Sequence, residues 1–97
     1  SYMILTPVGS MLSVIELPPK TVGELTGKTL LPTQQKTMDV LQYGEVVGVG
    51  DEATRFTVGD IILFEKLACH ITNFGYPSQH LIAEEFIHAR LYREAAS

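Results

Sequence analysis

Four side chains in the second half of the chain have the chemistry of metal ligands: Cys69, His70, His80 and His88. Zinc ligands usually come in local pairs such as Cys-x2–4-Cys or His-x3–5-His, and none of the four residues forms such a pair. A metal site would therefore require residues far apart in the chain to converge. We interpret the four as ordinary packed or surface side chains, and expect neither a metal nor a cofactor.

The adjacent carboxylates Glu84 and Glu85 lie between apolar strand segments and are typical of a solvent-exposed turn. The chain contains no nucleophile elbow and no P-loop. The glycines from Gly44 to Gly50 lack the G-x-G-x-x-G spacing of a dinucleotide-binding loop, and no helix is expected after them. We therefore expect no catalytic residue and predict that the protein is not an enzyme.

Composition excludes further classes of function. The formal charge is −4 and the isoelectric point is about 5.2, so a nucleic acid is not an expected partner. The single cysteine, Cys69, excludes an internal disulfide and fits a reducing cytosol. No apolar run approaches the roughly 18 residues of a membrane span, and no signal peptide is recognisable. We expect a cytoplasmic protein that does not bind membranes.

The length of 97 residues predicts one domain, over residues 1–97. Apolar residues make up 45% of the chain and charged residues 19%, and the mean hydropathy is +0.16. Such a small domain buries only roughly 60–65% of its unfolded surface, so additional burial between subunits would stabilise it. The composition therefore favours an oligomer.

The elements that would position any site are organised around residues 44–64. Val47 and Val49 fall on one face of an extended segment and Val46 falls on the other. The apolar run Ile61–Phe64 is typical of a strand covered on both faces. Glycines inside the first segment indicate a bend or a bulge. We predict two strands joined by a short polar loop, within a small all-β barrel.

This stretch resembles the centre of the chaperonin-10 (GroES) co-chaperonins. It reads Gly-Glu-Val-Val-Gly-Val-Gly from Gly44 and Val-Gly-Asp-Ile-Ile-Leu-Phe from Val58. The segment His80–Ala89 is similar to the family's closing strand, and Pro7–Val14 is similar to its opening pattern without the Asp-Arg pair. The resemblance implies an irregular GroES-like β-barrel. It also implies a homo-heptameric ring that caps a chaperonin chamber in which a client protein folds.

Residues 17–36 show neither helical nor strand periodicity, and prolines and glycines punctuate both ends. About 20 residues without secondary structure usually form a functional or disordered loop. Their apolar island, Thr29-Leu30-Leu31, could by itself also fold back onto the barrel. The family carries a mobile loop at this place. The resemblance implies that this loop binds the apical domains of a GroEL/Hsp60-type chaperonin through Gly27, Lys28, Thr29, Leu30 and Leu31.

The resemblance also predicts the subunit interface. In the family, the N-terminal strand pairs with the C-terminal strand of a neighbour, which here implies contacts from Ile4, Leu5, Ile87 and Leu91. Only Asp51–Thr57 separates the two central strands, so the hairpin that roofs the dome in many relatives is missing. Some phage-encoded co-chaperonins share this shortening. For such a member, the corresponding location would be the host cytoplasm.

The segment Asn73–Gln79 is predicted to be a turn because it contains Gly75 and Pro77. Its two aromatic residues, Phe74 and Tyr76, either cap the barrel or face outward. We expect both to be packed.

Two other classes of function remain open. Lipoyl- and biotinyl-type carrier domains also combine a Gly-x-Val strand with a later Val-x-x-Gly-Asp turn, and they present a modified lysine at a hairpin tip. The nearest candidate here is Lys66, which directly follows an apolar strand and is therefore in a poor context. A carrier also has no place for the segment 17–36. The remaining class is a generic SH3-like binding barrel, which no feature specifically supports.

Overall fold

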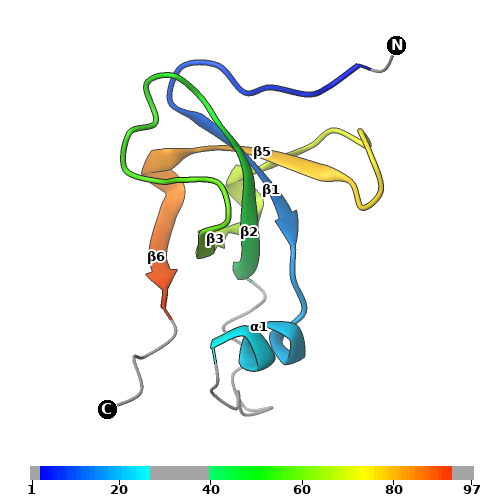
Figure 1. The fold of residues 1–97 in the computed structure, drawn as a ribbon, viewed down its shortest axis with the longest axis vertical. Coiled ribbons are helices and arrows are strands. Elements are labelled where there is room, and N and C mark those ends of the chain that lie inside the picture. The colour runs from blue at the N-terminus through cyan, green and yellow to red at the C-terminus, as the bar shows by residue number, and fades with distance from the viewer. Residues whose placement is uncertain (1–2, 27–39, 93–97) are drawn as a thin grey trace.

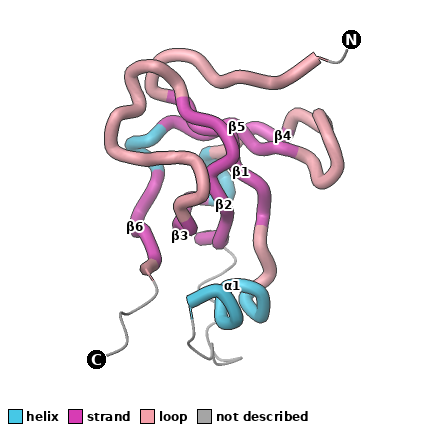
Figure 2. Tube along the Cα trace, in the orientation of Figure 1, coloured by secondary structure: helices cyan, strands magenta, loops and turns pink. Residues whose placement is uncertain are grey.

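The computed structural model describes residues 3–26 and 40–92 of the chain. These residues form one antiparallel sheet of six strands in the order β4-β5-β1-β2-β3-β6, with short helices at its margins (Figures 1 and 2). The strands are β1 (Met11–Glu16), β2 (Leu41–Val49), β3 (Ile61–Glu65), β4 (His70–Ile71), β5 (Gln79–Ala83) and β6 (Ile87–Leu91). The helices are α1 (Pro19–Thr26) and the 3-10 turns η2 (Lys66–Ala68) and η3 (Glu84–Phe86). The predicted all-β fold is confirmed.

The sheet curls around its core, which gives the fold its barrel character. Figure 1 shows β5 crossing β1 and β2, while β6 descends along the opposite side and α1 lies at the lower end. Side chains alternate between the two faces of a strand, so each strand contributes every second residue to the interior. The buried core consists of Leu12, Val14, Val46, Ala53, Ile62, Phe64 and Ile82.

A β-bulge interrupts the pairing of β1 with β2. Ser13 pairs with Gly48 but the next residue, Val14, pairs with Val46, so Val47 is the extra residue. A side chain at Gly48 would collide with the hydroxyl of Ser13, which explains why the chain has glycine there. The bulge predicted within this strand is confirmed.

The connection between β2 and β3 is a fixed loop. β2 and β3 pair antiparallel, with Gly44 opposite Ile62, as predicted. Asp51 Oδ1 accepts a hydrogen bond of 2.9 Å from the backbone N–H of Gly9, which ties the loop to the segment before β1. Ala53 is part of the core. The loop is therefore held at its start by the chain's own N-terminal segment.

The helix α1 contradicts part of a prediction. Residues 17–36 were expected to be a loop, yet residues 19–26 are helical, so the expectation is wrong for this part. Pro19 suits the first turn of a helix, where its missing N–H is not needed. The N–H of Val22 donates to the carbonyl of Pro18 over 3.2 Å and opens the helix.

Burial explains how so short a helix is held. Val22 is completely buried, and Leu17, just before the helix, is nearly so. The side-chain amide of Gln42 on β2 donates to the carbonyl of Leu17 over 3.1 Å. Isolated helices of this length are marginal in water, so this packing must stabilise α1. Among residues 19–23, the part of α1 whose burial the structure describes, only Val22 is buried, so this part of the sequence shows no helical period.

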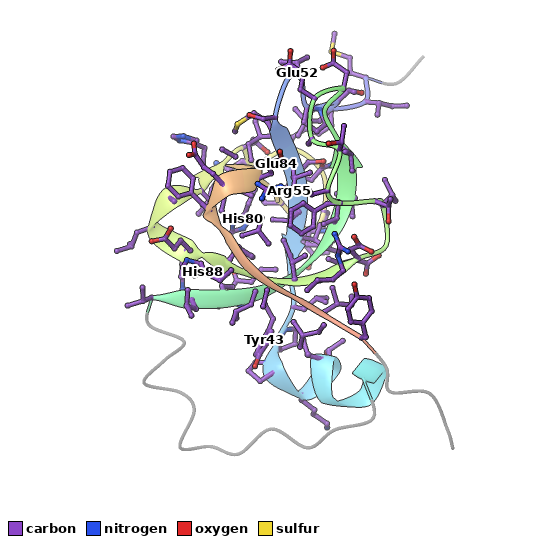
Figure 3. The ribbon with its side chains drawn as sticks, turned by 90° about the vertical axis from the view of Figure 1, so that its left-hand side faces the viewer. Tyr43, Glu52, Arg55, His80, Glu84 and His88 are labelled. Carbon is purple, nitrogen blue, oxygen red and sulfur yellow. The ribbon has the colours of Figure 1, made fainter. Side chains whose placement is uncertain are left out.

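Two side-chain predictions are also wrong. Tyr76 is fully exposed at the turn between β4 and β5, while Phe74 is partly buried. Glu84 is not solvent-exposed: its side chain is 15% exposed and one oxygen lies 3.6 Å from Nε of Arg55. Figure 3 shows these two side chains beside each other. Only Glu85 is exposed as predicted.

Candidate functional site

The predicted chaperonin-binding residues lie outside the described residues. They are Gly27, Lys28, Thr29, Leu30 and Leu31, and the structure describes the chain on both sides of them. The preceding chain ends in α1, and the following chain enters β2 at Leu41. In Figure 1 the end of α1 and the start of β2 lie at the same end of the sheet.

Two surfaces of the chain have no partner among residues 3–26 and 40–92. The first is the N-terminal arm, which we define as residues 3–6. It runs away from the sheet, and its residues Met3 and Ile4 are 88% and 85% exposed (Figure 1). The second is the outer edge of β6, since β6 pairs only with β3.

The four predicted interface residues belong to these two surfaces but do not pair with one another within the chain. Ile4 and Leu5 are on the N-terminal arm, where Leu5 is partly buried. Ile87 packs in part against the core, and Leu91 lies opposite Ile61 of β3. The N-terminal arm and the last residues of β6 lie at opposite ends of the molecule in Figure 1.

The side chain of Arg90 connects β6 to the loop between β2 and β3. Its Nε lies 3.2 Å from Oδ2 of Asp60, and its guanidinium donates to the carbonyl of Arg55. The guanidinium also lies over the ring of Phe56, 4.8 Å from its centroid. No local pattern in the sequence links Arg90 to this loop, whose contacting residue Arg55 lies 35 positions earlier in the chain. These contacts hold β6 in place while leaving its outer edge open.

The four side chains with the chemistry of metal ligands lie at several places in the fold. His70 is exposed on β4, and His88 lies on β6 with Nε2 3.4 Å from a carboxylate oxygen of Glu65. Cys69 and His80 do meet: Sγ and Nδ1 are 3.4 Å apart. Among the residues that the structure describes, no group of three or more histidines, cysteines or acidic residues could hold a metal ion.

On its other side, the imidazole of His80 lies near the carboxylate of Glu16. Nε2 of His80 lies 3.8 Å from Oε2 of Glu16. The imidazole is buried, and its ring stands edge-on to Phe64 with the centroids 6.3 Å apart. Burial raises the pKa of the Cys69 thiol, and the charge of Glu16 acts in the same direction. Sγ also lies 2.9 Å from the carbonyl oxygen of Lys66, which the thiol can use as an acceptor.

The sequence carries no signal for this row of three side chains. Glu16 ends β1, His80 belongs to β5 and Cys69 follows η2. Only the register of β1 with β5, which places Val14 opposite His80, brings Glu16 within reach of the imidazole. The exposed and buried histidines are distinguished in Figure 3, where His80 lies inside the fold and His88 at its margin.

Lys66 is the residue that a carrier domain would modify. It begins η2 between β3 and β4, and these two strands do not pair with each other. Lys66 is therefore not at the tip of a hairpin.

No protein-family model matches the chain, and no curated protein matches it in sequence. Within residues 3–26 and 40–92, no helix has both the length and the apolar character needed to cross a membrane.

Proposed function

We propose that this chain is a co-chaperonin subunit that assembles into a homo-heptameric ring and closes the chamber of a chaperonin. The observation that carries the proposal is the chaperonin-10-like stretch from Gly44 to Phe64. It falls on β2 and β3, two neighbouring antiparallel strands near the middle of an all-β sheet. The segment similar to the family's closing strand falls on β5 and β6. The pattern of resemblance and the pattern of elements therefore agree.

The two unpartnered surfaces support assembly. The N-terminal arm exposes Met3 and Ile4, and β6 leaves one edge without a partner strand in the described part of the chain. An unpaired strand edge offers backbone hydrogen bonds to an incoming segment. When two different surfaces of the same subunit pair, the interface is head-to-tail and closes into a ring if the rotation permits. Pairing of the arm with a neighbour's β6 would join subunits in this way.

Energetics explain why a capping protein of this kind would act as a ring. Burying Leu30 and Leu31 against a partner stabilises docking by about 1.5–3 kcal/mol each. Fixing each residue around them costs about 1–2 kcal/mol. One copy therefore binds weakly, whereas several copies on one ring bind together at a high effective concentration. Weak individual contacts also permit release when the chaperonin changes state.

The helix α1 shortens the proposed docking segment. Because residues 19–26 are helical and anchored through Val22, docking is assigned to the chain that follows Thr26. We therefore propose that contacts with the chaperonin begin at Gly27.

The carrier alternative has less support. A carrier lysine is presented at a hairpin tip, and Lys66 begins η2 between two strands that do not pair. A generic binding barrel would not need to form a ring. The oligomeric state of the protein therefore distinguishes this alternative from a co-chaperonin.

The proposed function is tested by exchanging two docking leucines for aspartate, Leu30→Asp with Leu31→Asp. Ring mass is measured by sedimentation, and binding to a chaperonin in the presence of ATP is measured by co-sedimentation. We expect the wild type to sediment at seven times the 10.7 kDa of the chain and to bind. The variant should keep the ring and lose binding, because the proposal assigns these two leucines to the contact with the chaperonin and not to the ring.

The matched control is Leu67→Asp with Ile71→Asp, which places the same two charges on exposed apolar residues of η2 and β4. This control should still bind. A wild-type chain that sediments as a monomer at micromolar concentration contradicts the co-chaperonin function itself. Undiminished binding by the docking variant would instead reject Leu30 and Leu31 as the docking residues.

A further inference from the structure

Glu16, His80 and Cys69 form a row in which a buried imidazole stands between a carboxylate and a thiol. We propose that Cys69 is a site of covalent thiol modification, that His80 is its proton acceptor, and that the reacting partner is a small disulfide. The co-chaperonin function proposed above does not use these residues, so the two proposals are independent of each other.

The geometry assigns a role to each ring nitrogen. The carboxylate of Glu16 lies 3.8 Å from Nε2, so it favours the tautomer in which Nε2 carries the hydrogen. Nδ1 then has a free lone pair, and it faces Sγ of Cys69 at 3.4 Å. A nucleophile within reach of a base, which is itself oriented by a third group, is the arrangement that activates thiols in proteins. When the imidazole becomes positive, it lies between the thiolate and the carboxylate, and both stabilise it.

Burial differs along the row in the way this chemistry requires. His80 is buried and its ring is fixed against Phe64, so Nδ1 cannot easily turn away from the thiol. Cys69 is only partly buried, so part of the residue faces solvent. Burial raises the pKa of the thiol, which makes a spontaneous thiolate scarce at neutral pH. A reactive Cys69 would therefore depend on a neighbouring base, and His80 is the base in contact with it.

The proposed step is a thiol–disulfide exchange. Nδ1 of His80 takes the proton from Sγ of Cys69, and the thiolate attacks one sulfur of the disulfide. A new S–S bond forms to Cys69 while the S–S bond of the disulfide breaks. The leaving thiolate takes the proton back from Nδ1 and departs as a thiol. The disulfide is the oxidant, one molecule of thiol is released for each Cys69 modified, and His80 returns to its neutral form.

The experiment measures the rate at which the intact folded protein forms a mixed disulfide with millimolar oxidised glutathione, followed by mass spectrometry. We expect one glutathione per wild-type chain and none on Cys69→Ser. His80→Gln should react about 10- to 100-fold more slowly, because loss of a positioned base has an effect of at least this order. Glu16→Gln should slow the reaction less, by about threefold, because it affects only the tautomer and the stability of the imidazolium.

Two matched variants separate this role from general effects. His88→Gln makes the same exchange at a histidine of β6 that pairs with Glu65 of β3. His70→Gln makes the same exchange at the residue that follows Cys69 in the chain. Both should react at the wild-type rate. A rate for folded His80→Gln that equals or exceeds that of the wild type would overturn the proposal.

A second measurement covers the case in which His80→Gln does not fold. The side chain of Glu16 is 43% exposed, so Glu16→Gln is expected to fold. An unchanged rate in this variant would then overturn the proposal. So would a wild-type thiol that gains no glutathione over hours in the folded state but gains it when the same chain is unfolded in urea.

Discussion

Gly50 lies where the start of the β2–β3 loop meets the backbone before β1. Its N–H donates to the carbonyl of Met11 over 2.8 Å. A Cβ at this position would collide with the carbonyl oxygen of Gly9 and would also lie 2.9 Å from the carbonyl oxygen of Met11. Both obstacles are backbone atoms, which cannot move aside as a flexible side chain can. At the scale of single residues, this close approach fixes the loop as firmly as any side-chain contact.

We predict that Gly50→Ala lowers the free energy of unfolding by about 3 kcal/mol, because the loop must move away from the backbone around Gly9 and Met11 to admit the methyl group. The control is Gly59→Ala. Gly59 has a φ of +98° but open space around it, so only the backbone strain of about 1–3 kcal/mol applies. Urea unfolding of both variants checks the prediction. If Gly50→Ala proves no more destabilising than Gly59→Ala, the backbone contact is not as close as the structure has it.

A second residue-scale prediction concerns Cys69 and pH. Burial raises its thiol pKa above the ordinary value of 9.0. Below that value the thiol is protonated in both the folded and the unfolded chain, so it adds no pH dependence. Above it, the unfolded chain loses the proton first, and the free energy of unfolding must fall as pH rises. We expect the wild type to lose stability relative to Cys69→Ser above pH 9 and to stay parallel to it below pH 8. Thermal unfolding across this range tests the sign, and curves that stay parallel up to pH 10 would refute it.

At the scale of elements, α1 shows that the chain before the proposed docking residues belongs to the fold. We predict that Val22→Ala lowers the free energy of unfolding by about 1.5–3 kcal/mol, because it removes two buried methyl groups and leaves a cavity. Lys20→Ala, an exposed change in the same helix, should fall within about 0.5 kcal/mol of the wild type. Chemical denaturation compares the two. Equal stabilities would mean that α1 is not packed against the sheet in solution.

Elements with dense patterns could be predicted from the sequence, and elements that depend on a single contact could not. β2 and β3 carry glycines, valines and an apolar run whose order predicts two strands, the first of them with a bulge. In α1, Val22 is the one buried residue among residues 19–23, whose burial the structure describes, and a single buried position shows no period. The row from Glu16 to Cys69 depends on the register of β1 with β5, which no local pattern in either strand specifies. Local backbone preferences and the alternation of apolar and polar residues can be recognised in the sequence. The register between distant strands is set only when the sheet packs.

At the scale of the whole molecule, the two unpartnered surfaces lie far apart. The N-terminal arm extends beyond one end of the sheet, and β6 ends toward the other (Figure 1). The same chain cannot pair these surfaces with each other, but two copies can. Arg90 already holds β6 against the loop on its inner side, so its outer edge is presented in a fixed position. A rigid edge loses little conformational freedom when a partner's arm pairs with it, which favours association.

The prediction at this scale is that Ile4→Asp converts the proposed ring to monomers. Ile4 is 85% exposed in the single chain, so the change costs the isolated subunit almost nothing and acts only where another copy covers the side chain. Leu67→Asp is the control, since Leu67 on η2 is also 85% exposed. Sedimentation should give 10.7 kDa for Ile4→Asp and seven times that mass for Leu67→Asp. Circular dichroism should show both variants folded. A folded Ile4→Asp variant that still sediments as the ring would place the subunit contact elsewhere, because a charge in a buried apolar contact would not be tolerated.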